Sequence, residues 1–385
     1  MRENAMCGLG MLILLAAVGC SDDTAPPGAI DITAGPSGDK EIRMIFGARP
    51  DTRSFRDWYA SCDNGNACFA FTGTDAGGWL MVRQDAGPDA APEIMVGLPA
   101  FSDETAGRDL ALDLDSERQT LILSRGEALS HEVPKDDVRA TLGRLASARA
   151  LAIAAGADMT VLPTAGASAA LLWIDERQGR LDTTTALIQR GNRPASTVPS
   201  APALPRVVPA APVDQGNFAR ASDPGEQGAE ADLTLPAAIE ALPDVKQCRA
   251  DTAFNEYLQK AVLAARLSPD TELWGVPCDA GAYNAMYDFY LTGPGGSDPR
   301  KADFPGWEPR ERTEGDIAGD GLVNPVFDAA TSTLRHFPRA RGIGDCGIIQ
   351  SWAWTGEAFV LLEERSMGNC WGMPSNLWPT IWRTQ

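Results

Sequence analysis

The chain has 385 residues, with 33 Lys and Arg against 52 Asp and Glu, which gives a formal net charge of -19. This excess of negative charge repels phosphate backbones and anionic lipid headgroups. No stripe of basic residues interleaved with aromatic residues offsets it, so nucleic-acid binding is disfavoured.

The first twenty residues have the pattern of an export signal. Arg2 precedes an apolar run from Met11 to Val18, and Gly19 and Cys20 follow it. The run is far shorter than the roughly 20 residues that span a bilayer, so a signal peptide is favoured over a transmembrane helix.

The signal ends in AAVGC, which resembles the lipobox of bacterial lipoproteins, although Ala17 stands where leucine is more usual. We therefore expect Cys20 to be acylated as a lipid anchor, with residues 21–40 as a flexible tether. Ser21 resembles an outer-membrane sorting residue. The expected location is the cell envelope, lipid-anchored in the outer membrane and facing the periplasm; ordinary cleavage, which leaves a soluble periplasmic protein, is the alternative.

Six cysteines remain after those of the signal: Cys62, Cys68, Cys248, Cys278, Cys346 and Cys370. An even number in an exported chain favours disulfides, and many complete pairings are possible. Pairing of neighbours joins 62 with 68, 248 with 278 and 346 with 370. None of the spacings is C-x-x-C, so a zinc ribbon or a thioredoxin-type motif has no support.

Residues 41–190 are predicted to form a first domain. In FRDWYASCDNGNACFAF, Asn64 and Gly65 separate two strand-like runs, which predicts a β-hairpin with Cys62 facing Cys68. Further strands are expected at GWLMVRQ, EIMVGL, LALDLD and QTLILS, and helices at residues 136–149 and 169–178, the second capped by Ser168. The expected fold is α+β, an antiparallel sheet covered by helices.

Residues 191–233 are predicted to be a linker, because six prolines lie between Pro194 and Pro212. Proline removes backbone donors and favours extended polyproline II.

Residues 234–385 are predicted to form a second, β-dominated domain that is rich in tryptophan. A helix is expected at residues 252–267, where Leu258, Val262 and Ala265 form one stripe. Strands are expected at YNAMYDFYL, LVNPVFD and STLRHF, followed by a hairpin in IIQSWAWTGEAFVLL. The predicted architecture is two β-rich domains, with antiparallel sheets and a few covering helices, joined by the linker.

The stretch RGIGDCG contains G-x-G-x-x-G around Cys346, and three interpretations compete. A dinucleotide site needs a helix after the glycines, whereas a hairpin pattern follows here, so no nucleotide cofactor is expected. A thiol nucleophile would need His336 as its base. A glycine-rich turn held by a Cys346–Cys370 disulfide is the favoured interpretation, because an exported free thiol is exposed to oxidation.

With only His131 and His336 as histidines, the sequence predicts no metal centre, and no motif indicates a Ser-His-Asp triad. Trp352, Trp354 and Trp371 are candidates for stacking on a glycan, although packing in a core is favoured for a hairpin that carries two tryptophans on one face.

Three stretches, FRDWYASCDNGNACFAF, CDAGAYN and RGIGDCG...W.WTGEAFVLLEE...C.G....WPTIWR, together resemble the bacterial family called domain of unknown function 1176. This resemblance spans most of the mature chain and implies no activity. GASAALLWIDERQGR and the spacing W...C.....C resemble the invasion-associated locus B family, which implies an envelope role.

These observations favour an exported envelope lipoprotein that acts as a non-catalytic binding or structural module. Its expected partners are the membrane, through the lipid anchor, and an envelope protein or glycan. The alternatives are a periplasmic hydrolase or thiol enzyme using Cys346 and His336, or a glycan-binding protein using the late tryptophans.

Overall fold

The computed structural model describes residues 30–34, 40–44, 48–98, 109–125, 129–218, 233–253, 255–307 and 321–385. Cys20 and the rest of the expected signal lie outside these residues. Strand β1 (Ile30–Ala34) lies in the stretch expected to be a tether and pairs antiparallel with β2 (Lys40–Met44), which begins at the last residue of that stretch. Within the described residues, no helix is both long enough and apolar enough to cross a membrane.

The first half contains a seven-stranded antiparallel sheet in the order β10-β11-β7-β6-β5-β4-β3. Its strands are β3 (Asp51–Phe55), β4 (Trp58–Cys62), β5 (Cys68–Gly73), β6 (Trp79–Gln84), β7 (Glu93–Gly97), β10 (Ile122–Arg125) and β11 (Leu129–Glu132). A second sheet has the order β13-β12-β8-β9. Its strands are β8 (Ala111–Leu114), β9 (Glu117–Thr120), β12 (Leu151–Ala155) and β13 (Asp158–Leu162).

Two helices cover this half, as the sequence predicts: α2 (Val138–Leu145) and α3 (Ala167–Arg177). Helix α3 packs against β3, β4 and β5. The predicted cap is wrong, because Ser168 lies inside α3 and Gly166 is the N-cap. Gly166 has φ 108°, and a Cβ there would lie 1.7 Å from the Phe55 carbonyl oxygen, so the close approach of helix and strand requires glycine.

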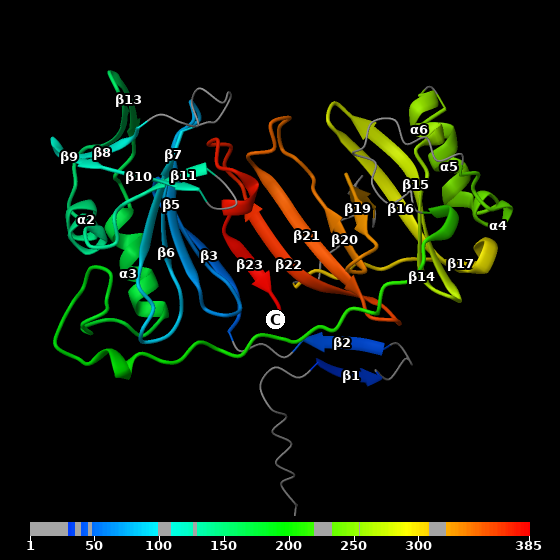
Figure 1. Cartoon of the computed structure of the whole chain (residues 1–385), viewed down its shortest axis with the longest axis horizontal. Coiled ribbons are helices and arrows are strands. Elements are labelled where there is room, and N and C mark those ends of the chain that lie inside the picture. Colours follow the sequence, from blue (N-terminus) through cyan, green and yellow to red (C-terminus); the bar gives the residue numbers. More distant parts are fainter. Residues whose placement is uncertain are drawn as a thin grey trace, which may run out of the picture.

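The second half has two antiparallel sheets that share a core (Figure 1). The first contains β14 (Leu263–Ser268), β15 (Thr271–Gly281), β16 (Asn284–Gly293), β17 (Ser297–Lys301) and β18 (Leu322–Val323). The second contains β19 (Val326–Asp328), β20 (Thr333–His336), β21 (Gly347–Trp354), β22 (Phe359–Met367) and β23 (Thr380–Arg383). The short helices of this half are α4 (Ala237–Glu240), α5 (Pro243–Asp251) and α6 (Glu256–Lys260), with 3-10 turns η3 (Pro294–Gly296) and η4 (Ser375–Leu377).

The helix predicted at residues 252–267 is wrong. Helix α5 ends before it, α6 covers only part of it, and its last part is strand β14. Along β14, Leu263, Ala265 and Leu267 face the core between the two sheets, whereas Ala264 belongs to the core beneath the helices. A strand buried on both faces lacks polar alternation, so its apolar run also fits a helical stripe.

The Pro-rich segment is an extended strap that passes both halves, with short turns at η1 (Ala195–Thr197) and η2 (Gly216–Phe218) (Figure 1). The Gln385 N–H donates to the Pro205 carbonyl over 2.9 Å, and the Ala210 N–H donates to the Trp354 carbonyl over 2.7 Å. Val207 packs in a cluster with residues of β21 and β22. These contacts fix the strap against the last sheet.

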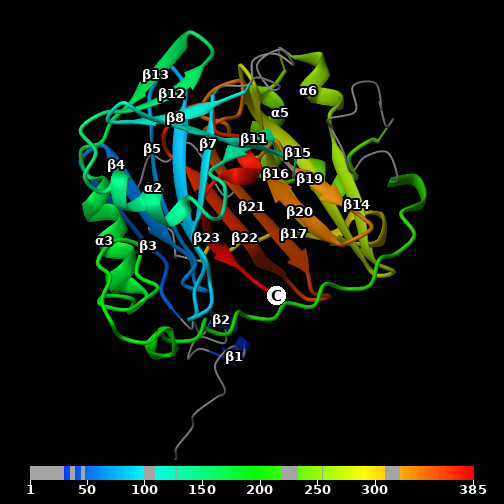
Figure 2. The same ribbon diagram turned by 60° about the vertical axis from the view of Figure 1, so that its left-hand side comes forward.

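The two halves also touch directly, and Figures 1 and 2 show red strand β23 on the side of its sheet that faces blue strands β3 and β4. One apolar cluster contains side chains from β5, β6, β7, β21 and β22 and from residues 371–378. The halves therefore share a buried seam, which places the edge of the last sheet beside the edge of the first.

Candidate functional site

The structure contains three disulfides, Cys62–Cys68, Cys248–Cys278 and Cys346–Cys370, with Cα–Cα distances of 4.1, 4.2 and 4.8 Å. These are the three pairs that pairing of neighbours predicts. Cys62 and Cys68 also face each other in the β4–β5 ladder, as the hairpin pattern indicates.

The glycine-rich stretch is a turn that leads into strand β21. A strand therefore follows the glycines where a dinucleotide site would need a helix. Gly344 has φ 70° and Gly347 has φ 139°, and a Cβ on Gly347 would lie 2.2 Å from the Pro338 carbonyl oxygen. These positions therefore need glycine because of the backbone conformation and the close approach of the neighbouring chain.

The thiol interpretation is wrong for this oxidised form. Cys346 is fully buried and its sulfur is bonded to Cys370, so no thiolate is available. His336 is also buried: its Nδ1 accepts a hydrogen bond from the Val323 N–H over 2.9 Å, and its ring packs edge-on against Trp352. The imidazole is thus held in the core of the second half.

Asp345 joins the turn to the segment that carries Cys370. Its carboxylate accepts hydrogen bonds from Arg341 Nε (2.6 Å), Arg341 Nη2 (2.5 Å) and the Gly372 N–H (2.7 Å). Burial alone would raise the pKa of this carboxyl, but the hydrogen bonds and charge of Arg341 and the bond from Gly372 outweigh burial and hold the pKa below its usual value.

The three tryptophans considered for glycan stacking are packed inside the protein, so that interpretation is wrong for them. Trp352 and Trp354 are each 1% exposed and Trp371 is 6% exposed. Trp371 lies in the seam, with ring centroids 5.9 Å from Tyr59 and 6.4 Å from Phe71. A face that packs against protein rings offers no surface to a sugar.

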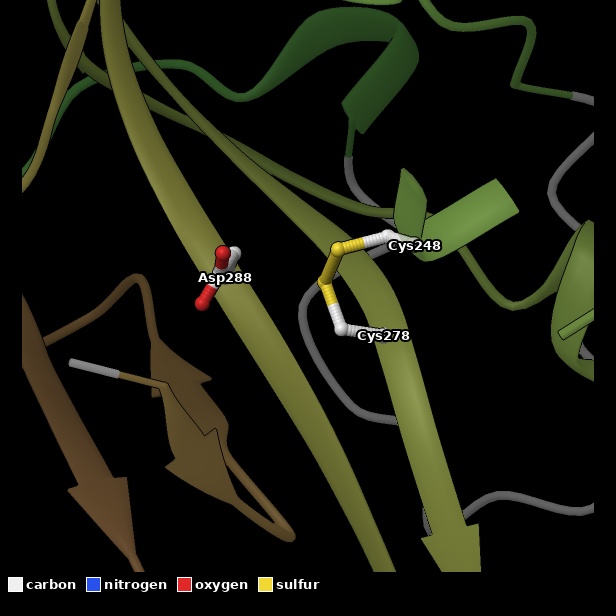
Figure 3. A group of neighbouring side chains, drawn as sticks. All are labelled: Cys248, Cys278 and Asp288. Atoms are coloured by element: carbon white, nitrogen blue, oxygen red, sulfur yellow. A yellow bond between two sulfur atoms is a disulfide. The ribbon is translucent and has the colours of Figure 1, made fainter. Parts of the chain in front are cut away.

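Two groups of side chains place a carboxylate beside paired cysteines. Cys248, Cys278 and Asp288 form one of them (Figure 3), and Asp345 lies beside the third disulfide. Metal binding by cysteine needs thiolate sulfur, whereas these sulfurs are bonded to each other. Asp288 instead pairs with Lys301 over 3.1 Å. Both groups therefore have structural roles.

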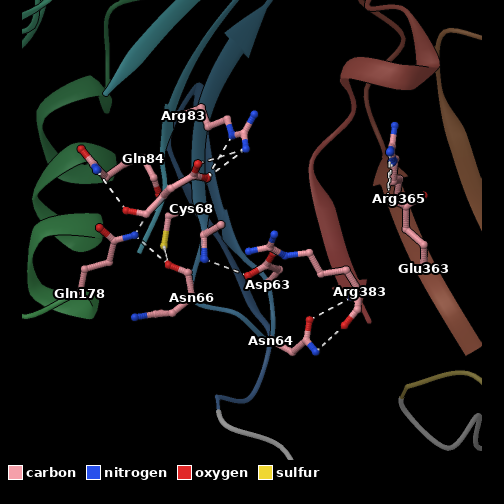
Figure 4. Close-up of polar contacts among 12 residues, drawn as sticks. Asp63, Asn64, Asn66, Cys68, Arg83, Gln84, Gln178, Glu363, Arg365 and Arg383 are labelled. Carbon is pink, nitrogen blue, oxygen red and sulfur yellow. Dashed lines mark hydrogen bonds and ion pairs between the residues drawn. The ribbon is translucent and has the colours of Figure 1, made fainter. Parts of the chain in front are cut away.

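A polar contact crosses the seam between the halves (Figure 4). Asn64 donates through Nδ2 to the Arg383 carbonyl (2.8 Å) and accepts from the Arg383 N–H (2.9 Å), so its amide pairs with the outer edge of β23. Asp63, which is 1% exposed, accepts from the Ala67 N–H over 2.8 Å. Arg383 Nε lies 2.5 Å from Asp63 Oδ2, so an ion pair joins the two halves.

Burial raises the pKa of Asp63 above its usual value, and the Arg383 charge and the Ala67 N–H offset only part of that effect. The Asp63 carboxylate is thus tolerated in the seam because a cation from the other half faces it.

The end of α3 carries charged residues of the stretch LLWIDERQGR, and two of them are fully buried. Asp175 accepts from the Leu187 N–H over 2.6 Å, and burial raises its pKa despite this bond. Arg180 donates to Gln178 Oε1 and to the Gly87 carbonyl, each over 2.6 Å. These charges hold loops of the first half.

Arg177, the last residue of α3, points elsewhere. Its Nε donates to Asn66 Oδ1 over 3.2 Å, and its Nη2 donates to the carbonyl oxygen of Arg49. These bonds hold the guanidinium beside the start of β3, where the two halves meet.

A cleft of about 450 Å³ opens between the edge strand β3 and the edge strand β23. The described residues that line it are Arg49, Pro50, Asp51, Thr52, Arg177, Trp307 and Ile381. The lining combines two arginines, one carboxylate, one hydroxyl, an indole and aliphatic carbon. Such a mixture of apolar surface with a few polar groups is typical of small-molecule sites.

The residues 52–385 match a family model described as protein of unknown function (DUF1176). The chain belongs to this family. Uncharacterized protein YpfG of Escherichia coli (strain K12) is 28% identical over 361 residues, which cover 88% of this chain and 94% of that protein. The crystal structure of invasion associated protein b from Bartonella henselae is 16% identical and covers 34% of this chain and 99% of that chain, with a TM-score of 0.27.

In this DUF1176 member, two of the three stretches that carried the resemblance build the seam. FRDWYASCDNGNACFAF supplies β4, most of β5 and the loop with Asp63 and Asn64, and the last stretch supplies β21 to β23. The cleft itself was not predicted, because Arg49, Arg177 and Trp307 lie far apart in the chain.

Proposed function

We propose that the protein is an exported, lipid-anchored component of the bacterial cell envelope that binds a small ligand without transforming it. The ligand site is the cleft between β3 and β23. The signal-like N-terminus with Cys20 supports export and anchoring, and three disulfides are typical of an oxidising compartment.

The observation that carries the proposal is that both halves contribute to one cleft with fixed walls. Arg177 is held by hydrogen bonds to Asn66 and Arg49, and Trp307 Nε1 donates to Glu364 Oε1 over 3.2 Å. The strap bonds to Gln385 and the seam bonds to Arg383, so both hold the end of β23 in place. A preformed site binds with little loss of conformational entropy.

Binding is favoured over catalysis by where the reactive side chains lie. The chain has two histidines, His131 and His336, and both are 5% exposed within strands of the two sheets. The six cysteines of the described residues form disulfides. Neither an imidazole nor a thiol therefore reaches a ligand in the cleft, and these groups are the commonest general bases and nucleophiles.

The test is to express the full chain and a Cys20→Ser variant with an alkyne-labelled fatty acid, and to fractionate the cells. We expect labelled wild type in the outer-membrane fraction and unlabelled Cys20→Ser outside it. Native mass spectrometry of the detergent-solubilised wild type should show a bound small molecule that is missing from a cleft-filling Thr52→Trp variant. Unlabelled cytosolic wild type would refute the anchoring, and identical spectra of wild type and Thr52→Trp would refute the binding.

A further inference from the structure

We propose that the ligand of the cleft is a small organic anion, whose carboxylate or phosphate group binds Arg177 while its apolar body packs against Trp307 and Ile381. This inference rests on the proposed binding function and names the ligand class for the same cleft.

The first support is the local charge. The chain carries a formal net charge of -19, so an average part of its surface repels anions. The cleft differs, because two arginines and one aspartate line it. The aspartate, Asp51, is already engaged: its Oδ2 accepts from Arg53 Nε over 3.1 Å. Arg177 therefore brings a positive charge to this cleft of an acidic protein.

The second support is the geometry of Arg177. Its side chain is half-buried and two of its nitrogens are oriented by Asn66 and Arg49. A guanidinium has five N–H donors in a planar fork, so donors remain after these two bonds. A planar fork that is already oriented suits the two oxygens of a carboxylate or phosphate.

The third support is an unused backbone donor on β3. The Cα–Cα distance of 4.1 Å between Cys62 and Cys68 is that of a non-hydrogen-bonded pair, and the bond from the Asp63 N–H to the Ala67 carbonyl agrees with it. Cys62 therefore pairs through its backbone with Asp51 on β3. The next residue, Thr52, then turns its N–H and C=O away from β4, toward the outer edge that borders the cleft.

The apolar side of the cleft offers a surface on which the apolar part of the ligand can pack. Trp307 is half-buried and its indole is oriented by Glu364, while Pro50 and Ile381 are buried apolar neighbours in the lining. The volume of about 450 Å³ falls within the range of small-molecule pockets. A flat body on an indole, with its charge at an arginine, satisfies both sides of the cleft.

The experiment measures binding of three related probes by isothermal titration calorimetry: phenylacetate, phenyl phosphate and the neutral phenylacetamide. We expect at least one anion to bind wild type about tenfold or more tighter than the amide, since one charge-assisted hydrogen bond supplies about that factor. Arg177→Gln should remove this difference. The matched control Arg118→Gln, which alters an exposed arginine of β9 in the other sheet of the first half, should leave it unchanged.

The outcomes separate this inference from the proposed function. If phenylacetate loses more affinity in Arg177→Gln, the ligand class is a carboxylate. If phenyl phosphate loses more, it is a phosphate. If the amide binds as tightly as both anions, or if none of the probes binds, the anion inference is wrong, whereas the native mass spectra still decide whether the cleft binds a ligand. If Arg177→Gln does not fold, added NaCl must weaken binding of the anion to wild type while leaving the amide unaffected; equal salt dependence would overturn the inference.

Discussion

Two arginine–aspartate pairs, one within the second half and one across the seam, have arginines of almost equal exposure but carboxyl pKa values shifted in opposite directions. In Arg341–Asp345 the side chains are 38% and 6% exposed, and in Arg383–Asp63 they are 37% and 1% exposed. The pKa of Asp345 is lowered, whereas the pKa of Asp63 is raised. An arginine partner by itself therefore does not decide the direction.

Burial raises the pKa of both carboxyl groups, and the difference lies in whether the partners of each group outweigh it. Asp345 accepts two bonds from Arg341 in a fork and a third from the Gly372 N–H, and together these outweigh burial. Asp63 is the more deeply buried carboxyl, and the Arg383 charge and the Ala67 N–H do not outweigh its burial. The pair inside one half therefore favours the ionised carboxyl, whereas burial in the seam favours the neutral one.

The largest expected effect is that of Asp345→Ala. It removes the Arg341 fork and leaves the half-buried Gly372 N–H without its acceptor, so we expect the free energy of unfolding to fall by about 3 kcal/mol. Urea unfolding followed by tryptophan fluorescence measures it. Asp113→Ala is the control, because Asp113 has the same fork to Arg118, which is 57% exposed; it should cost less than about 1 kcal/mol. Equal losses would contradict the role assigned to the burial of Asp345 and to its third bond.

A smaller effect is expected from the isosteric amides. Asp345→Asn should cost about 2 kcal/mol, because an amide cannot accept the full fork and the third bond. Asp63→Asn should cost less than about 1 kcal/mol, because burial already favours the neutral carboxyl and the amide oxygen can still accept from Ala67. The comparison fails if Asp63→Asn is the more damaging change in urea unfolding.

The smallest expected effect is a difference in how the contributions of Asp345 and Asp63 to the free energy of unfolding depend on pH. The folded pKa of Asp345 lies below 3.8, so its stabilising contribution is present above about pH 4 and is lost as the pH falls through that folded pKa. The folded pKa of Asp63 lies above 3.8, so its contribution is most favourable below about pH 4 and is lost as the pH rises through its folded pKa.

Urea midpoints of wild type and the two Asn variants, measured between about pH 3 and pH 7, resolve these opposite trends. The advantage of wild type over Asp345→Asn should shrink in acid. The urea midpoint of wild type should rise relative to that of Asp63→Asn as the pH falls. Parallel curves for the two variants would show that the carboxyl groups do not differ.

The sequence predicted local features well. The hairpin with Cys62 and Cys68 depends on turn residues and alternation within a dozen residues, and the structure contains it. The α+β class with antiparallel sheets is also confirmed. The error at residues 252–267 arose because β14 is buried on both faces, where the period of a strand is hidden.

The seam and the cleft were beyond prediction from one sequence. Asn64 bonds to Arg383 across 319 residues, and Arg177 bonds to Arg49 across 128 residues. No local pattern specifies such pairs, because the first depends on how the two halves dock and the second on how α3 packs against the sheet of the first half.

What the sequence by itself determined is the set of short-range features: the signal-like N-terminus, the acidic balance, the spacing of the cysteines and the alternation of the hairpins. Only the tertiary structure decided the functions of individual side chains. It packed Trp371 against Tyr59 and Phe71 in the seam, and it brought Arg177 and Trp307 to one cleft. The physical reason is that the alternation of a strand indicates which of its side chains share a buried face. Which other element covers that face depends on packing between elements that are distant in the chain.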